Sequence, residues 1–167
     1  MNIREIISDT GKLKAGQRIL LSGTIYTARD EAHARLIKLL DSGEKPPFEL
    51  KGSAIYYCGP SPAKPGNIIG ACGPTTSSRM DVFTPRMLDE GVKILIGKGS
   101  RNDFVVDAIK KNKAVYMIAA GGVAALLSKT VKKADIAAFE DLGPEAIYKL
   151  EVENMPLIVA ITAIGSL

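Results

Sequence analysis

The chain alternates short apolar runs with segments of helical periodicity, and this alternation constrains the possible folds more than any other feature. The expected strands are Arg18–Tyr26, Ala54–Cys58, Lys93–Gly97, Ala114–Ala119, Ala134–Phe139 and Pro156–Thr162. The expected helices are Thr27–Leu40, Thr84–Glu90, Asn102–Asn112, Gly122–Ser128 and Pro144–Lys149. Continuous apolar strands that alternate with helices are typical of α/β proteins with parallel sheets. We therefore expect one α/β domain over residues 1–167 with a central, largely parallel sheet.

Two threonines are expected to begin helices as N-cap residues. Thr27 precedes a charged first turn, and Thr84 precedes Pro85, a residue favoured at the first helical position. The segment 59–66 contains three prolines and two glycines, so we expect it to be irregular.

Charge and hydropathy argue against several classes of protein. The formal net charge is only +4, tryptophan is absent, and no basic run is interleaved with aromatic residues. We therefore expect no nucleic-acid partner. No apolar run approaches the roughly 20 residues that span a bilayer, and the N-terminus lacks the apolar core of a signal peptide. We expect a soluble, cytoplasmic protein without membrane contact.

Two cysteines, Cys58 and Cys72, are the only thiols of the chain. Two thiols in an intracellular protein do not make a disulfide framework. They are also too few to hold an iron–sulfur cluster alone, which usually needs three or four thiolates.

The first candidate site segment, residues 23–33, places Arg29 at the start of a helix directly after a strand. Parallel sheets bind ligands beyond the carboxyl ends of their strands, and a guanidinium there could hold a carboxylate. An ordinary solvated first turn is the alternative. His33, the only histidine, lies four residues after Arg29 and is interpreted as a helix-surface or capping residue rather than a ligand.

The second candidate segment, residues 73–81, carries four hydroxyl residues in a row between a Gly-Pro turn and a helical segment. Successive backbone N–H groups at such a turn can bind an anion, and Arg79 adds a positive charge. A capped turn rich in serine and threonine is the alternative. Either Thr75 or Thr76 could bring a hydroxyl to the same place.

The third candidate segment, residues 94–100, places Lys98 between two glycines at the end of a strand. The spacing does not match a Walker A loop, so a nucleotide site is not indicated. A flexible turn with a solvated lysine is the alternative. Converging cations without a phosphate motif suit a small dianion such as a dicarboxylate.

Five motifs in this order resemble the β-subunit region of class I (iron–sulfur) fumarases and L-tartrate dehydratases. They are GTIYTARDEAHARL, YYCGPSPAKPG, GPTTSSRMD, IGKG and LGPEAIYKLEV, and the resemblance runs from about Ile3 to Ile164. It implies a three-layer β/β/α swivelling domain. It also implies a [4Fe–4S] cluster held by a separate α subunit, within a higher hetero-oligomer, and no metal ligand in this chain.

The resemblance also implies roles for single residues. Arg29 and Arg79 match the family's carboxylate-binding arginines, and Lys98 matches a further cation near the substrate. Thr75 matches the proposed catalytic base. A threonine hydroxyl is a poor base unaided, so we expect a neighbouring carboxylate from the α subunit. The implied reaction is the reversible hydration of fumarate to malate.

Other interpretations stay open at this point. L-tartrate dehydratase would use the same motifs on a substrate with one more hydroxyl. The chain could instead be a stand-alone dicarboxylate-binding or regulatory module. Cys72 is interpreted as a small packing residue that could lie near the cluster, and Ser78 occupies a variable position without an assigned role.

Overall fold

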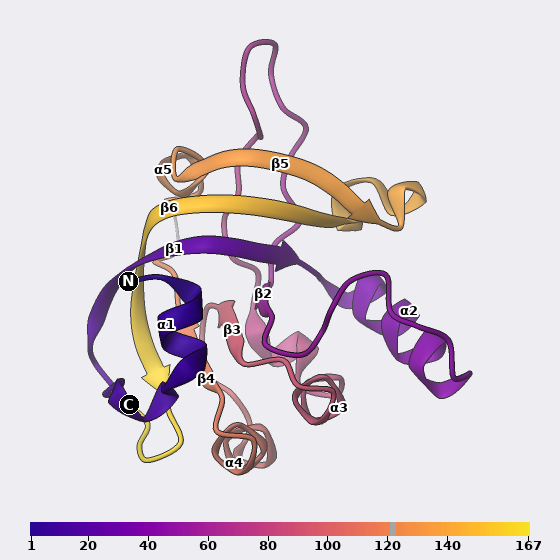
Figure 1. Cartoon of the computed structure of the whole chain (residues 1–167). Coiled ribbons are helices and arrows are strands. Elements are labelled where there is room, and N and C mark those ends of the chain that lie inside the picture. The colour runs from indigo at the N-terminus through magenta and orange to yellow at the C-terminus, as the bar shows by residue number, and fades with distance from the viewer. Residues whose placement is uncertain (121–122) are drawn as a thin grey trace.

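The computed structural model describes residues 1–120 and 123–167, and its elements follow the predicted alternation (Figure 1). The strands are β1 (Arg18–Thr27), β2 (Ala54–Tyr56), β3 (Ile94–Gly97), β4 (Val115–Ile118), β5 (Val131–Ala138) and β6 (Ile147–Ile161). The helices are α1 (Ile3–Ser8), α2 (Asp30–Asp41), α3 (Thr84–Asp89), α4 (Asp103–Lys111) and α5 (Ala124–Ser128). Short 3₁₀ turns are η1 (Thr10–Lys12), η2 (Ser77–Met80) and η3 (Glu140–Glu145). Within these described residues, no helix has the length and apolarity needed to cross a bilayer.

Gly122, where the sequence predicts the start of a helix, lies outside the described residues. The rest of that predicted helix corresponds to α5. The irregular character expected for residues 59–66 is confirmed, because this stretch carries no helix or strand.

The six strands form one sheet, and five of them close into a barrel. Strands β1, β2, β3 and β4 are neighbours in that order and run parallel. Strand β6 runs antiparallel to both β4 and β1, which closes the barrel, and β5 extends the sheet by pairing with β6. The α/β class is confirmed. The sheet is mixed rather than largely parallel, because every pairing made by β6 is antiparallel.

The largest correction concerns the C-terminal part of the chain. The sequence predicts a helix over Pro144–Lys149 and a separate strand over Pro156–Thr162, whereas β6 is a single strand of 15 residues. Pro144 lies inside the 3₁₀ turn η3, where Gly143 has a φ of 58°. The residues that follow are paired with β1 on one side and β5 on the other. Hydrogen bonding on both sides therefore outweighs the local preference for a helix.

Both predicted N-caps are wrong. Thr27 is the last residue of β1, and its hydroxyl oxygen accepts a hydrogen bond from the Tyr148 N–H at 3.0 Å, which joins β1 to β6. Helix α2 instead begins at Asp30 with Arg29 at the N-cap position. Thr84 is itself the first residue of α3, and Phe83 is the N-cap.

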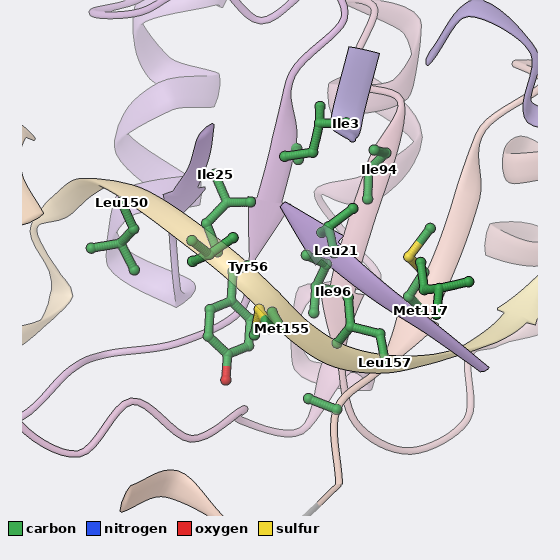
Figure 2. Close-up of a cluster of buried hydrophobic side chains, with 14 of the residues drawn as sticks. Ile3, Leu21, Ile25, Tyr56, Ile94, Ile96, Met117, Leu150, Met155 and Leu157 are labelled. Atoms are coloured by element: carbon green, nitrogen blue, oxygen red, sulfur yellow. The ribbon is translucent and has the colours of Figure 1, made fainter. Parts of the chain in front are cut away.

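Two apolar cores lie on opposite faces of β2, β3 and β4. Along β2, Ala54 and Tyr56 belong to the core inside the barrel, while Ile55 belongs to the core outside it. The inner core also receives residues of β1 and β6, as Figure 2 shows for Leu21, Ile25, Leu150, Met155 and Leu157. The outer core packs residues of α2, α3 and α4 against the sheet. Burial on both faces explains why these strands are continuous apolar runs.

We expect Leu21→Ala to lower the free energy of unfolding by about 3 kcal/mol, because the lost side chain leaves a cavity inside the barrel. Leu21 is fully buried, whereas its neighbour Leu20 is 53% exposed on the opposite face of β1. Leu20→Ala is the matched control and should change stability by less than about 0.5 kcal/mol. Urea unfolding of both variants measures the difference, and equal losses would contradict this orientation of β1.

Candidate active site

The parallel register of β1, β2 and β3 brings three of the predicted segments to one end of the barrel. Thr27 pairs with Tyr56, and Tyr56 pairs with Ile96, so the carboxyl ends of the three strands lie side by side. Arg29 follows β1 and Lys98 follows β3 within two residues of these strand ends. The loops that carry Arg29 and Lys98 therefore begin at the same end of the barrel, as parallel strands require.

The hydroxyl-rich segment lies directly against these strand ends. The Thr75 N–H donates to the Tyr57 carbonyl at 2.7 Å, and the Ser77 N–H donates to the Lys98 carbonyl at 3.0 Å. Thr76 and Lys98 also form an isolated parallel bridge. These bonds extend the strand ladder into the loop, so that Thr75 is held beside the end of β2 and Arg79 follows in η2.

Arg29 and Arg79 meet at a carboxylate that the sequence interpretation did not identify as their partner. Asp30 Oδ2 lies 3.2 Å from an Arg79 Nη atom and 3.8 Å from an Arg29 Nη atom. Glu145, from η3, lies 3.9 Å from Arg29 Nε. The adjacent charges of Arg29 and Asp30 were visible in the sequence, but Glu145 comes from a segment that was predicted to be helical.

Two atoms of this cluster are buried without a hydrogen-bond partner among the described residues: Arg29 Nε and Asp30 Oδ2. Both atoms lie within ion-pair distance of an oppositely charged side chain, but none of these contacts has the geometry of a hydrogen bond. Buried polar groups are nearly always satisfied in folded proteins, and leaving one unsatisfied costs free energy. A ligand carboxylate that accepts from Arg29 Nε would remove this cost at that atom.

Gly59 leaves the room in which the Arg29 side chain lies. A Cβ atom at Gly59 would come within 3.0 Å of Arg29 Cδ and 3.1 Å of the Pro144 carbonyl oxygen. A side chain at Gly59 would therefore crowd Arg29 and the Pro144 backbone, a contact that the sequence interpretation, which treated Gly59 only as a turn residue, did not reveal.

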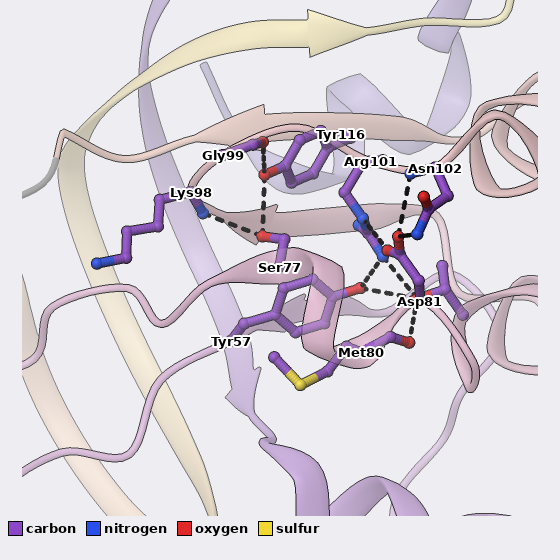
Figure 3. Close-up of polar contacts among 10 residues, drawn as sticks. Tyr57, Ser77, Met80, Asp81, Lys98, Gly99, Arg101, Asn102 and Tyr116 are labelled. Carbon is purple, nitrogen blue, oxygen red and sulfur yellow. Dashed lines mark hydrogen bonds and ion pairs between the residues drawn. The ribbon is translucent and has the colours of Figure 1, made fainter.

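Lys98 is fixed through its backbone while its side chain remains exposed. Its N–H donates to Ser77 Oγ at 3.0 Å and its carbonyl accepts from Ser77. Its ammonium group makes no ion pair with any residue in the described ranges. Lys98 thus does not join the arginine cluster directly and presents a free cation from the adjoining loop (Figure 3).

His33 is a buried structural residue beneath the site rather than a residue of the helix surface. Its Nδ1 lies 2.8 Å from the Arg29 carbonyl, which also accepts from the His33 N–H, and α2 has no side-chain cap, so the capping interpretation is wrong as well. A carbonyl can only accept, so Nδ1 carries the proton of the neutral ring. The ring stacks on Phe83 and meets Tyr57 edge-on. Burial lowers the pKa of His33 to about 4, although the bond to the Arg29 carbonyl acts in the opposite direction.

The two thiols face each other but do not form a metal site. Cys58 and Cys72 are buried and their sulfur atoms lie 3.4 Å apart. The hydrogen bond to Cys72, together with burial, raises the pKa of Cys58 above its usual range. Metal binding needs thiolates, and no group of three or more candidate ligands occurs in the described parts of the chain. These residues therefore do not fit a resident iron–sulfur cluster.

The arrangement is suited to binding a small anion with two carboxylates. Two guanidinium groups, an ammonium group and the Thr75 hydroxyl come from three segments that lie at one end of the barrel. Such fixed cations stabilise negative charge that develops on a bound carboxylate.

Comparison with known proteins agrees with this geometry. A model of the fumarase C-terminus family matches residues 1–166. Fumarate hydratase 2 of Leishmania major is 37% identical over 166 residues, which cover 98% of this chain. A putative L(+)-tartrate dehydratase subunit beta of Methanocaldococcus jannaschii is 43% identical over 164 residues, and the L(+)-tartrate dehydratase subunit beta of Escherichia coli is 35% identical over 164 residues. Each of these two matches covers 95% of this chain.

The relatives differ in how much of their length the chain spans. It covers only 29% of the Leishmania fumarate hydratase, but 84% and 80% of the two beta subunits.

We expect His33 to make stability depend on pH between about 4 and 6.5. The pKa of His33 is lower in the folded protein than in the unfolded chain, so the unfolded chain binds the proton in this range. The contribution of His33 is complete above pH 6.5 and falls by about 2 kcal/mol between pH 7 and pH 5. Unfolding measured at both pH values in wild type and His33→Gln tests this. An identical pH dependence in both proteins would contradict it.

Proposed function

Because this chain belongs to the fumarase C-terminus family, we propose that it is the β subunit of a hydro-lyase that reversibly hydrates fumarate to (S)-malate. The observation that carries the proposal is the Arg29–Asp30–Arg79 cluster, whose buried Arg29 Nε lacks a hydrogen-bond acceptor among the described residues. An unsatisfied guanidinium next to a hydroxyl-rich loop supports a carboxylate substrate. The match to most of the length of two tartrate dehydratase beta subunits supports a subunit role.

The cations of this chain would bind and orient the diacid. Removal of the C3 proton of malate builds negative charge onto the adjacent carboxylate, and Arg29 and Arg79 are placed to stabilise it. Lys98 would add a third positive charge from the neighbouring loop. The substrate carboxylate would compete with Asp30 for the two arginines.

Thr75 would move the C3 proton. Its backbone is fixed by the bond to Tyr57, so its hydroxyl can be held in one place relative to the arginines. A threonine hydroxyl needs a stronger base beside it. Asp30 and Glu145 already face the arginines, so we propose that this carboxylate comes from the partner subunit.

We also propose that a [4Fe–4S] cluster, which the residues of this chain do not fit, belongs to an α subunit that completes the enzyme. Assembly of the two chains would give a higher hetero-oligomer that acts in the cytoplasm. The barrel, with one core inside it and one beneath the helices, is consistent with a flattened three-layer β/β/α swivelling domain.

L-tartrate dehydration is the second candidate function. It is favoured by the names of two relatives. The chain covers most of the length of both, and they are called L(+)-tartrate dehydratase subunit beta, in one case as putative. Tartrate and malate share the two carboxylates that the arginines would hold, so the cation cluster suits both.

The experiment that tests the proposal is anaerobic co-expression of this chain with the α subunit of its own organism, followed by assays with both substrates. Hydration of fumarate is the expected result. Turnover of L-tartrate alone would replace the first candidate with the second. An intact cluster with no turnover of either, while dicarboxylates still bind, would contradict a catalytic role and indicate a non-catalytic dicarboxylate-binding module.

We expect Thr75→Ala to lower kcat about 100- to 10,000-fold with little change in KM, because the proton acceptor is lost while the cations remain. Thr76→Ala is the matched control, since Thr76 is the adjacent hydroxyl and is exposed. It should retain nearly full activity. Steady-state kinetics of the two assembled variants measure the difference, and wild-type turnover by Thr75→Ala would remove Thr75 as the base.

A further inference from the structure

We propose that the buried Asp81–Arg101 ion pair is a positioning device that clamps the Thr75–Arg79 segment against the Lys98 loop. The inference rests on the proposed function for its catalytic consequence. The clamp itself concerns only the geometry of the two loops. Neither Asp81 nor Arg101 reaches the arginine cluster, so both would act through the residues they hold.

Asp81 uses both carboxylate oxygens to hold the end of the loop that precedes α4. Arg101 Nε donates to Oδ1 at 2.6 Å. Oδ2 accepts from the Asn102 backbone N–H at 3.0 Å and from Asn102 Nδ2 at 2.6 Å. The side chains of Asp81 and Arg101 are 2% and 0% exposed, so water competes little for these bonds. Asp81 ends the segment that carries Arg79, and Arg101 ends the loop that carries Lys98.

Arg101 also reaches the sheet and α3. One Nη atom donates to Thr84 Oγ1 at 2.7 Å and to the Tyr57 hydroxyl at 3.3 Å. The guanidinium lies over the rings of Tyr57 and Tyr116, 5.2 Å and 4.9 Å from their centroids. A planar group with several donors is needed for this set of contacts, which a lysine could not reproduce.

A second contact, at Ser77, fixes the other end of the same segment (Figure 3). Ser77 Oγ accepts from the Lys98 N–H, and it lies 2.9 Å from the Tyr116 hydroxyl. That hydroxyl has one hydrogen, which the Gly99 carbonyl must receive at 2.8 Å, so Ser77 donates to Tyr116. A Cβ atom at Gly97 would collide with Ser77 Oγ. The segment is therefore held at Ser77 and at Asp81, and Arg79 lies between these two points.

Stability alone does not account for a buried pair of this kind. Removing two charges from water is costly, and apolar replacements of buried ion pairs are often neutral or stabilising. The pair does what an apolar contact could not, because directional bonds fix the register of one loop relative to another. Misplacement of a reacting group by about 1 Å can cost about 100-fold in rate.

The test compares wild type with Arg101→Met and with Asp81→Asn/Arg101→Met, the double variant in which no unpaired buried charge remains. Hydrogen–deuterium exchange is measured on the full chain, and kinetics are measured on the complex with its α subunit. Arg86→Met is the matched control, because Arg86 pairs with Asp41 and Glu90 on the exposed side of α3. It should match wild type in both measurements.

We expect the double variant to keep a melting temperature near that of wild type. Exchange should accelerate in residues 73–81 and 97–102 while the barrel strands stay protected, and kcat should fall about 100-fold. Arg101→Lys should recover only part of this loss, because lysine can pair with Asp81 but lacks the other contacts.

Three results would overturn the inference. They are unchanged exchange in the two loops, accelerated exchange throughout the barrel, and local acceleration without loss of kcat. If the wild-type complex turns over neither diacid while exchange still changes locally in the variant, the proposed function fails and the clamp between the loops stands.

Discussion

The closure of the barrel by β6 is the constraint on which the rest of the structure depends. This strand pairs with β1 over residues 149–158 and with β4 over residues 158–161, so the parallel strands β1 to β4 are held at both edges. A one-residue slip in any of them would exchange the inner and outer cores. The register in turn sets where β1, β2 and β3 end, and therefore where Arg29, Thr75 and Lys98 are placed. The site is in this sense a property of strand pairing.

Charge compensation at the site follows from the same placement. Arg29 and Arg79 would repel each other if they faced one another alone, and Asp30 lies between them with Glu145 at the edge. The charges are paired, but the hydrogen bonds are not complete, since Arg29 Nε has no acceptor within the described residues. A site can thus be electrically balanced without a ligand and still gain hydrogen bonds from one, which favours exchange of a carboxylate over uptake of a neutral molecule.

The local sequence pattern was sufficient to predict the strands and helices whose apolar periodicity is strong. It was also sufficient to predict the three loops at their ends. It failed where pairing partners are distant in sequence. The second half of the helix expected at Pro144–Lys149 is the start of β6, because it is hydrogen-bonded to β1 on one edge and to β5 on the other, and no local window contains that information. Thr27 was expected to cap a helix for the same local reason, yet its hydroxyl oxygen accepts a hydrogen bond from the Tyr148 N–H of β6. The proposed site residues come from motifs in the sequence, whereas Glu145 and the Arg101 contacts depend on tertiary geometry alone.

A row of stacked planar side chains lies beneath the site and surrounds the only histidine, whose ring is neutral. Phe83 stacks on His33, His33 meets Tyr57, and Arg101 lies over Tyr57 and Tyr116. The Arg101 charge, after burial, is a further cause of the lowered pKa of His33. Both oxygens of the carboxylate paired with Arg101 are already used, and the Asp30 charge, which raises the pKa of His33, is outweighed by burial. The row therefore tolerates one permanent charge, and arginine, which stacks and donates in several directions, is the residue that carries it.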